Sequence, residues 1–359
     1  MAARPIDVVL DALRHREPAW VPRMAGFTPA LLERFRKETG ATDPADYWDF
    51  EVREVGFAET RAKTDFSRYF PADLHPRITR VNEWGVGHIP GSSFHFEDYV
   101  HPMEGFTSVK ELEAYPWPDV TAGYRRSNVP AEVEQWHARG YAVRAMTPKA
   151  NGTLFENAWL LRGLERLLVD FIENEEFAAA LLDRLCEFQV ENARFLGNCR
   201  VDVLRTGDDV GTQRGMMMSP AMWRKWLKPR LARVIAAARS QKQDLHVFYH
   251  SDGDIRAIIP DLIEIGVDVL NPVQPECMDP AELKRLYGDR LAFWGTVGTQ
   301  TTMPFGSPAE VKRVVKERIR TVGKHGGLLL APTHVLEPDV PWENVVAFFD
   351  AAKEYGGKP

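Results

Sequence analysis

From residue 140 onwards, short apolar runs alternate with longer segments of helical periodicity. The runs that predict strands are 141–146, 201–205, 245–249, 267–270, 291–295 and 327–331. The segments that predict helices are 175–196, 219–240, 254–265, 280–287 and 308–322. Strands that alternate with helices in this way are typical of a parallel sheet whose connections are helical.

The N-terminal part of the chain is less regular. Apolar residues at helical spacing predict an N-terminal helix within residues 1–20, a short strand is expected over 21–25, and residues 28–63 predict broken helices. The Gly-, Pro- and aromatic-rich stretch 77–105 predicts a strand near residue 80 and a lid-like insertion. Eight strands in all predict an α/β fold, a (β/α)8 TIM barrel that forms a single domain over 1–359. An open doubly wound sheet is the alternative, but the GxGxxG fingerprint that would favour it is absent.

The amino-acid composition and net charge indicate which kind of molecule the protein is expected to bind. Hydrophobic residues make up 44% and charged residues 27%, values that are ordinary for a globular protein. The net charge of −6 leaves no basic stripe, so a small-molecule substrate is expected and nucleic acid is not. No window reaches about 18 apolar residues and no export signal is recognisable, so we expect a cytoplasmic protein, monomeric or homodimeric, with no membrane span. The three cysteines form no CxxC pair, which fits a reducing compartment.

Polar residues follow the predicted strands, where a parallel barrel builds its site. Asp208 and Asp209 are candidate acid–base groups, together with His250 and His334. The candidate substrate-binding residues are Arg23, a clamp for a carboxylate or phosphate, and Asn271, Gln274 and Thr296. The structural alternative for the Asp208-Asp209 pair is that the two carboxylates accept hydrogen bonds from backbone N–H groups at a turn.

His250 and Asp252 suggest a metal site. Separated by one residue in extended backbone, the two side chains face the same ligand, and His334 after the last strand would complete a three-donor Zn²⁺ site with an open position. Alternatively, Asp252 caps the following helix and His250 bonds a backbone carbonyl. Cys277 is either a thiolate ligand, a nucleophile or an inert thiol.

Four stretches resemble the uroporphyrinogen decarboxylase superfamily, which includes the corrinoid-dependent methyltransferases. They read GDDVGTQRGMMMSPAMWRKWLKPR, HSDGDIRAIIPDLIEIGVDVLNPVQ, GDRLAFWGTVGTQ and LLLAPTHVLEPDVPWEN. The resemblance implies a (β/α)8 barrel, in agreement with the strand count.

Two branches of this superfamily make different predictions. The decarboxylases carry Arg-Gln-Ala-Gly-Arg after the first strand, whereas residues 22–27 read PRMAGF with a single Arg. A porphyrinogen has many carboxylates and requires several cations, so porphyrinogen decarboxylation is not expected. The methyltransferases bind zinc through His-x-Cys-Gly and a later Cys. In this chain the corresponding positions are His250, Asp252 and His334, a set that still suits Zn²⁺ but is less thiophilic.

The resemblance therefore implies a methyltransferase-like enzyme. It would move a methyl group between a small methoxylated or methylated-amine substrate and a corrinoid supplied by a separate protein, with zinc at the barrel mouth. Two alternatives remain open: a decarboxylase or lyase that acts on a small carboxylated substrate without corrinoid, and a non-catalytic small-molecule-binding barrel. The insertion's aromatics Trp84, Phe94, Phe96 and Tyr99 are expected to exclude water from the site.

Overall fold

The computed structural model describes residues 3–91 and 97–357. Its central sheet has seven parallel strands in the order β1-β5-β6-β9-β10-β11-β12. These strands are β1 (Val52–Val55), β5 (Ala142–Met146), β6 (Val203–Gly207), β9 (His246–His250), β10 (Val269–Asn271), β11 (Ala292–Val297) and β12 (Leu328–Pro332). Antiparallel strands outside this sheet are β2 (Arg80–Val81), β3 (Gly87–Pro90) and β4 (Glu97–Val100), and β7 (Gly211–Thr212) with β8 (Gly215–Met216).

An extended segment before the first sheet strand closes the barrel. Arg23 forms an isolated parallel bridge with Leu330 of β12. Met24 N donates to Leu330 O over 3.1 Å, and Leu330 N donates to Pro22 O over 2.9 Å. On its other side, Arg23 N donates to the Glu51 carboxylate, just before β1, over 2.9 Å. The segment thus takes the place of the predicted first strand, and the (β/α)8 prediction is confirmed.

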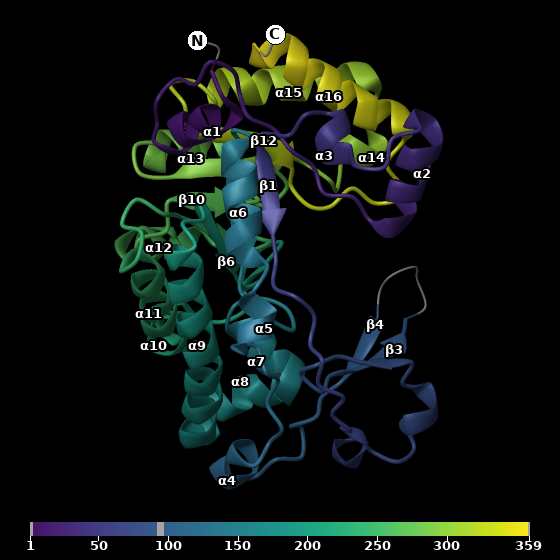
Figure 1. Ribbon diagram of the computed structural model, residues 1–359, viewed down its shortest axis with the longest axis vertical. Coiled ribbons are helices and arrows are strands. Elements are labelled where there is room, and N and C mark those ends of the chain that lie inside the picture. Colours follow the sequence, from purple (N-terminus) through teal and green to yellow (C-terminus); the bar gives the residue numbers. More distant parts are fainter. Residues whose placement is uncertain (1–2, 92–96, 358–359) are drawn as a thin grey trace.

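Helices surround the sheet, with α9, α10 and α11 along one flank and α15 and α16 along another (Figure 1). The α-helices are α1 (Pro5–Leu13), α2 (Pro29–Thr39), α3 (Pro44–Tyr47), α4 (Val109–Glu113), α5 (Gly123–Arg126), α6 (Val129–Ala138), α7 (Phe155–Arg162), α8 (Leu164–Glu173), α9 (Glu175–Asn198), α10 (Pro220–Trp226), α11 (Lys228–Arg239), α12 (Ile259–Glu264), α13 (Pro280–Tyr287), α14 (Thr302–Phe305), α15 (Pro308–Thr321) and α16 (Trp342–Gly356). The 3-10 helices are η1 (Ser67–Tyr69), η2 (His75–Arg77) and η3 (Arg256–Ile258). No described helix is long and apolar enough to cross a membrane.

The barrel interior is apolar where the strands begin and charged where they end. Helix α1 contributes Val9 and Leu13 to a buried cluster with the inward residues of the strands. These inward residues are Val52, Ala142, Val203, Phe248, Val269, Ala292, Trp294, Leu329 and Ala331. Because side chains alternate between the two faces of a strand, the next inward positions on β6 and β9 lie two residues further along, toward the mouth. The apolar end thus supports a polar layer above it.

The second barrel strand was assigned to the wrong segment from the sequence. It is β1, inside the stretch 28–63 that was predicted to be helical, whereas the strand near residue 80 is β2 of a separate antiparallel sheet. Strand β1 reads VREV, and two charges in four residues hide a strand from a search for apolar runs. Arg53 is nevertheless buried, because its guanidinium lies 4.0 Å from the centroid of the Tyr141 ring.

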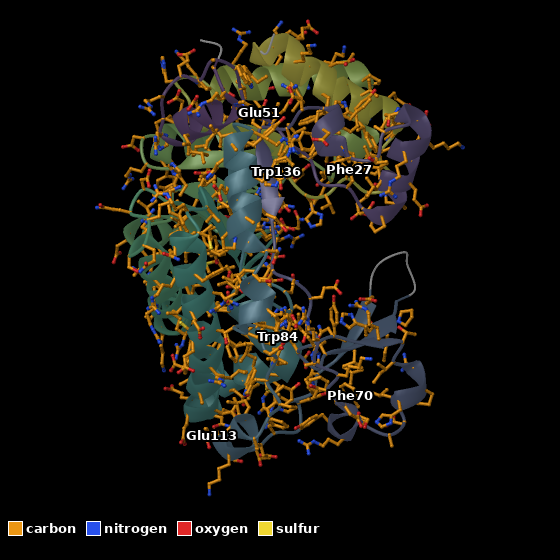
Figure 2. The ribbon with its side chains drawn as sticks, viewed as in Figure 1. Phe27, Glu51, Phe70, Trp84, Glu113 and Trp136 are labelled. Atoms are coloured by element: carbon orange, nitrogen blue, oxygen red, sulfur yellow. The ribbon has the colours of Figure 1, made fainter. Side chains whose placement is uncertain are left out.

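The insertion carries the sheet β2-β3-β4, which lies apart from the barrel helices α15 and α16 (Figure 1). Trp84, labelled in Figure 2, is 1% exposed. Its ring packs 6.0 Å from Phe188 of α9, and its carbonyl accepts a 2.6 Å hydrogen bond from the Tyr115 hydroxyl. Trp84 is therefore a core residue that anchors the insertion. Tyr99 is partly exposed, and Phe94 and Phe96 lie outside the described residues, so the lid role stays a prediction.

Candidate active site

The site is built where β6 and β9 end side by side. Gly207 of β6 pairs with His250 of β9, and Asp208 N donates to His250 O over 3.0 Å. Gly207 has φ +152°, and a Cβ at this position would lie 2.3 Å from His250 O. Glycine is therefore required for the two strand ends to approach closely, which brings the loop that starts at Asp208 against the loop that follows His250.

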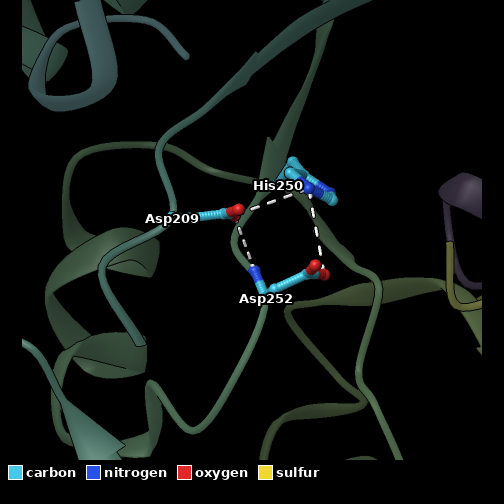
Figure 3. A group of neighbouring side chains, drawn as sticks. All are labelled: Asp209, His250 and Asp252. Atoms are coloured by element: carbon cyan, nitrogen blue, oxygen red, sulfur yellow. Dashed lines mark hydrogen bonds and ion pairs between the residues drawn. The ribbon is translucent and has the colours of Figure 1, made fainter. Parts of the chain in front are cut away.

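Asp209, His250 and Asp252 form one compact group (Figure 3). His250 Nε2 lies 3.5 Å from Asp209 Oδ1 and 3.9 Å from Asp252 Oδ1. Asp252 N donates to Asp209 Oδ1 over 2.9 Å, which fixes the Asp209 carboxylate. Within the described residues this is the group whose candidate ligand atoms all lie within 4.8 Å of one another.

Asn271 determines which nitrogen of the His250 ring faces this group. Asn271 Nδ2 donates to Trp294 O over 2.6 Å, so the amide oxygen is directed at His250. His250 Nδ1 lies 2.6 Å from that oxygen and must be the protonated nitrogen that donates to it. The Nε2 lone pair consequently faces Asp209 and Asp252. Asn271 lines the cavity at the mouth, but its observed role is to orient His250.

Burial shifts the pKa values of the group. Burial lowers the pKa of His250 to about 4, despite the opposing effect of Asp209, so the ring is neutral at pH 7. Burial, reinforced by the nearby Asp209 charge, raises the pKa of Asp252 to about 7. Asp252 Oδ1 is buried and has no hydrogen-bond partner. A buried carboxylate oxygen without a donor is costly, and a bound cation is one way to satisfy it.

The donor set fits a divalent metal ion. A tetrahedral zinc site with bonds of about 2.1 Å places neighbouring donor atoms about 3.4 Å apart. The observed separations from His250 Nε2, 3.5 and 3.9 Å, differ from this value by no more than half an ångström. The unpartnered Asp252 oxygen and the Nε2 lone pair both face the space between the three side chains. Asp209, His250 and Asp252 could therefore hold a metal ion, and this set shares two members with the set predicted from the sequence.

Asp208 lies behind the site and not in it. Its carboxylate accepts hydrogen bonds from Leu154 N over 2.9 Å and from Glu156 N over 3.0 Å, at the N-terminal end of α7. Burial raises the pKa of Asp208 to about 7, although these N–H donors oppose the shift. Of the Asp208-Asp209 pair, the structure therefore places Asp209 at the mouth and Asp208 in the role of a helix cap.

Glu156 of α7 is a neighbour that the sequence did not reveal. It is 6% exposed, and its Oε2 accepts a 3.0 Å hydrogen bond from Asp209 N. Burial, together with the charges of Asp209 and Asp208, raises the pKa of Glu156 to about 8. The run FENAWLL places a Glu in an apolar helix, but nothing in the sequence indicates which strand end that helix meets.

His334 and Arg23 are not brought into the group. His334 is exposed on the loop after β12, where it lines the rim of the cavity. Chain direction explains the position: Thr333 is buried, and its N–H bonds Val297 O, which turns the next side chain outward. Arg23 donates to Trp48 O over 3.3 Å, whereas Met24 lines the cavity. The predicted triad of His250, Asp252 and His334 is thus replaced by one that contains Asp209.

The remaining candidate residues, Gln274, Thr296 and Cys277, make contacts within the protein. Gln274 is buried, and its Oε1 accepts a 2.7 Å hydrogen bond from Gly253 N, which holds the loop after His250. Thr296 is fully buried, and its carbonyl accepts a 3.0 Å hydrogen bond from Arg318. Cys277 Sγ lies 3.2 Å from Gln213 Oε1, and burial raises the pKa of its thiol, which disfavours the thiolate.

A cavity of about 540 Å³ adjoins the group at His250, which is the member of the group that lines it. The cavity is lined by Phe248, His250, Asn271 and Trp294. Its apolar lining from the N-terminal part of the chain comes from Met24, Phe27 and Phe50. Its charged lining residues on the barrel strands include Glu54, Arg144 and Arg205. A second cavity of about 320 Å³ is also lined by Glu54, Arg144 and Arg205 and therefore adjoins the first. Neither Arg144 nor Arg205 was among the site residues predicted from the sequence. The available signal was a charge within or at the end of a strand-forming apolar run: Arg144 interrupts YAVRAM, and Arg205 ends VDVLR.

Comparisons with known structures give the fold. The structure superposes on a methyltransferase from Methanosarcina mazei with a TM-score of 0.67 and 18% identity, covering 99% of both chains. An endo-beta-1,4-xylanase from Gloeophyllum trabeum reaches 0.43 at 11% identity, covering 96% of this chain and 99% of that one. The intracellular xylanase TsXylA from Thermoanaerobacterium saccharolyticum reaches 0.42 at 10% identity, covering 94% and 91%.

Comparison of sequences gives the family. No curated protein matches the chain. Residues 155–355, more than half of the chain, match the family described as uroporphyrinogen decarboxylase (URO-D). This region runs from α7 to α16 and contains Asp209, His250 and Asp252. The chain therefore belongs to the uroporphyrinogen decarboxylase family.

Proposed function

We propose that this protein is a methyltransferase that moves a methyl group between a small methoxylated or methylated-amine substrate and a corrinoid carried by a separate protein, with zinc at the barrel mouth. The observation that carries the proposal is the convergence of His250 Nε2, Asp209 Oδ1 and Asp252 Oδ1 next to the cavity. The likeness of the fold to a methyltransferase from Methanosarcina mazei is consistent with it.

Asp209, His250 and Asp252 would hold the metal, and Asn271 would keep the His250 ring in the tautomer that binds it. A bound Zn²⁺ would supply a Lewis acid that polarises the ether oxygen or amine nitrogen of the substrate. Two carboxylates and a neutral imidazole carry a net charge of −2 when both acids are ionised, so the loaded site is neutral. Charge neutrality suits a site in which His250 is buried.

Glu156 has a complementary role in this proposal. With a pKa of about 8, it carries a proton at pH 7 next to Asp209. A neutral Glu156 adds no further negative charge beside the Asp209 carboxylate, which therefore stays available as a donor. Loss of the methyl group leaves an electron pair on the substrate oxygen or nitrogen, and that atom takes up a proton. Glu156, whose Oε2 accepts from Asp209 N, is a buried acid beside the site that holds a proton at neutral pH.

The apolar part of the cavity wall suits a small substrate. Met24, Phe27 and Phe50 line the cavity, and apolar side chains of this kind exclude water from the reacting group. Exclusion of water matters because a reduced corrinoid and an activated methyl donor both have competing reactions in water. The Arg23 clamp expected for the decarboxylase alternative is not formed, since Arg23 donates to Trp48 O and does not line the cavity.

The test is methyl transfer to free reduced cobalamin, followed by its absorbance, with zinc-loaded protein and a panel of methoxylated aromatic compounds and methylamines. We expect turnover of at least one substrate and none with His250→Ala. Arg194→Gln, at an exposed position on α9, is the matched control and should behave as the wild type. Release of carbon dioxide from carboxylated compounds without methyl transfer would contradict the proposal and support a decarboxylase.

A further inference from the structure

Two arginines project into the barrel below the His250 group. Arg144 of β5 pairs with Val203 of β6, and Arg205 lies two residues beyond Val203, so both guanidinium groups enter the same face of the sheet. Both residues line the cavity of about 540 Å³ and its neighbour of about 320 Å³. Arg205 also lies two residues before Gly207, the partner of His250, which places it about 7 Å down the strand from the metal-binding group.

The two arginines differ in their partners. Arg144 is 7% exposed, pairs with the Glu54 carboxylate and lies 4.7 Å from the centroid of the Trp294 ring. Arg205 makes no hydrogen bond or ion pair with any residue that the structure describes, and its Nε is buried without a partner. Arg205 makes a cation–π contact with the Phe248 ring, whose centroid lies 6.0 Å from the guanidinium carbon. Arg205 is thus the cation at this level that has no ion-pair partner among the described residues, although the more distant carboxylates of Glu54, Glu156 and Asp209 act on its charge.

An unpaired guanidinium inside a barrel is destabilising unless a ligand compensates its charge. Burial and repulsion from Arg144 lower the pKa of Arg205 to about 10, but the group remains charged at pH 7. Lys149 also lines the smaller cavity, together with the carboxylate of Glu83. A planar fork of N–H donors matches a carboxylate in a bidentate geometry. The pair therefore forms an anion-binding floor at the bottom of the cavity.

We propose that Arg205, supported by Arg144, binds a carboxylate of the substrate, so that the substrate is a small methylated acid lying along the barrel axis with its methyl-bearing end at His250. The orientation of the methyl end rests on the proposed function, whereas the anion site does not. Because Glu54 already neutralises Arg144, one cation remains, which matches a singly charged carboxylate better than a doubly charged phosphate.

The test measures thermal unfolding at pH 7 and fixed ionic strength with three probes: 4-methoxybenzoate, the neutral 4-methoxybenzyl alcohol and inorganic phosphate. We expect 4-methoxybenzoate to raise the unfolding temperature of the wild type in a concentration-dependent manner, with little effect of the other two. Arg205→Gln should weaken the apparent affinity for 4-methoxybenzoate at least tenfold. Arg194→Gln should leave it unchanged.

A structural role for Arg205 makes the opposite prediction for the protein without ligand. If Arg205 only supported the barrel, Arg205→Gln would lower the unfolding temperature, whereas removal of an uncompensated cation should leave it equal or higher. A lower unfolding temperature, equal binding of the alcohol, stronger binding of phosphate or no binding of 4-methoxybenzoate by the wild type would each overturn the inference. Zinc loading, measured on the same samples, separates the two proposals. Arg205→Gln should load zinc normally, and failure of the wild type to load zinc would count against the metal site alone.

Discussion

Asn271 Oδ1 lies 2.6 Å from His250 Nδ1, and this contact decides the chemistry of the His250 ring. The amide cannot turn over without losing the 2.6 Å bond from its Nδ2 to Trp294 O. Three consecutive strands, β9, β10 and β11, therefore cooperate to aim one lone pair at Asp209 and Asp252. The orientation is a property of the sheet and does not depend on a bound ligand.

The first prediction concerns this contact. Asn271→Ala leaves the three metal donors in place but removes the acceptor for His250 Nδ1, so the ring loses its fixed tautomer. Loss of such a supporting hydrogen bond lowers metal affinity by about 10- to 100-fold. Zinc titration calorimetry measures the change. Asn198→Ala, at an exposed position at the end of α9, is the matched control and should bind zinc as the wild type does. Equal affinity in both variants would show that Asn271 does not support the site.

The second prediction concerns pH. Between the unfolded pKa near 3.8 and the folded value of about 7, Asp252 is protonated in the native state and ionised in the unfolded state. The native state then binds more protons, so this group lowers the stability of the metal-free protein as pH rises from about 4 to 7. Asp252→Asn removes that loss. Since the side chain is 30% exposed, the gain at pH 8 should be about 1–2 kcal/mol, and it should vanish near pH 4.

Urea unfolding in the presence of a chelator, at pH 4.5 and at pH 8, measures this difference. Glu317→Gln, at an exposed position on α15, serves as a carboxylate control and should show no comparable pH dependence. Zinc should reverse the order at pH 8, because the metal stabilises the wild type and not Asp252→Asn. A variant that is less stable than the metal-free wild type at pH 8 would contradict the raised pKa.

The third prediction separates the two adjacent acids. Asp208→Ala removes the acceptor for the Leu154 and Glu156 N–H groups at the start of α7, and it should reduce the free energy of unfolding by about 1–3 kcal/mol. Asp209→Asn should cost less stability, because its amide oxygen still accepts from Asp252 N. Chemical denaturation of both variants with a chelator present gives the comparison. A larger loss for Asp209→Asn would reverse the assigned roles.

The sequence predicted the barrel because most of its strands are apolar runs of five or six residues. It failed at β1, whose charged residues have partners far away in the chain: the buried Arg53 contacts Tyr141, and the exposed Glu54 pairs with Arg144. The sequence also placed His250, Asp252 and Asp209 at strand ends, and the structure brings them together. These positions follow from chain direction alone, since parallel strands end at one mouth.

The sequence did not predict which way each side chain in the loops after the strands would point. The sequence does not distinguish the role of Asp208 from that of Asp209, and only the packing of α7 against β6 shows that Asp208 is a helix cap. His250 is the last residue of β9, whereas His334 lies two residues beyond the end of β12 and is exposed. Arg205 stood inside a strand and was missed, because charged residues were sought only beyond strand ends.

The most direct test of the metal site is zinc titration of the metal-free protein at pH 7.5, comparing the wild type with Asp209→Asn and His334→Ala. The group in the structure and the set predicted from the sequence both contain His250 and Asp252. They differ only in their third member, Asp209 or His334, which these two variants remove. We predict one zinc ion per wild-type chain, affinity at least tenfold weaker in Asp209→Asn, and affinity close to that of the wild type in His334→Ala. Zinc binding that survives in Asp209→Asn but is lost in His334→Ala, or a wild-type protein that binds no zinc, would contradict the site.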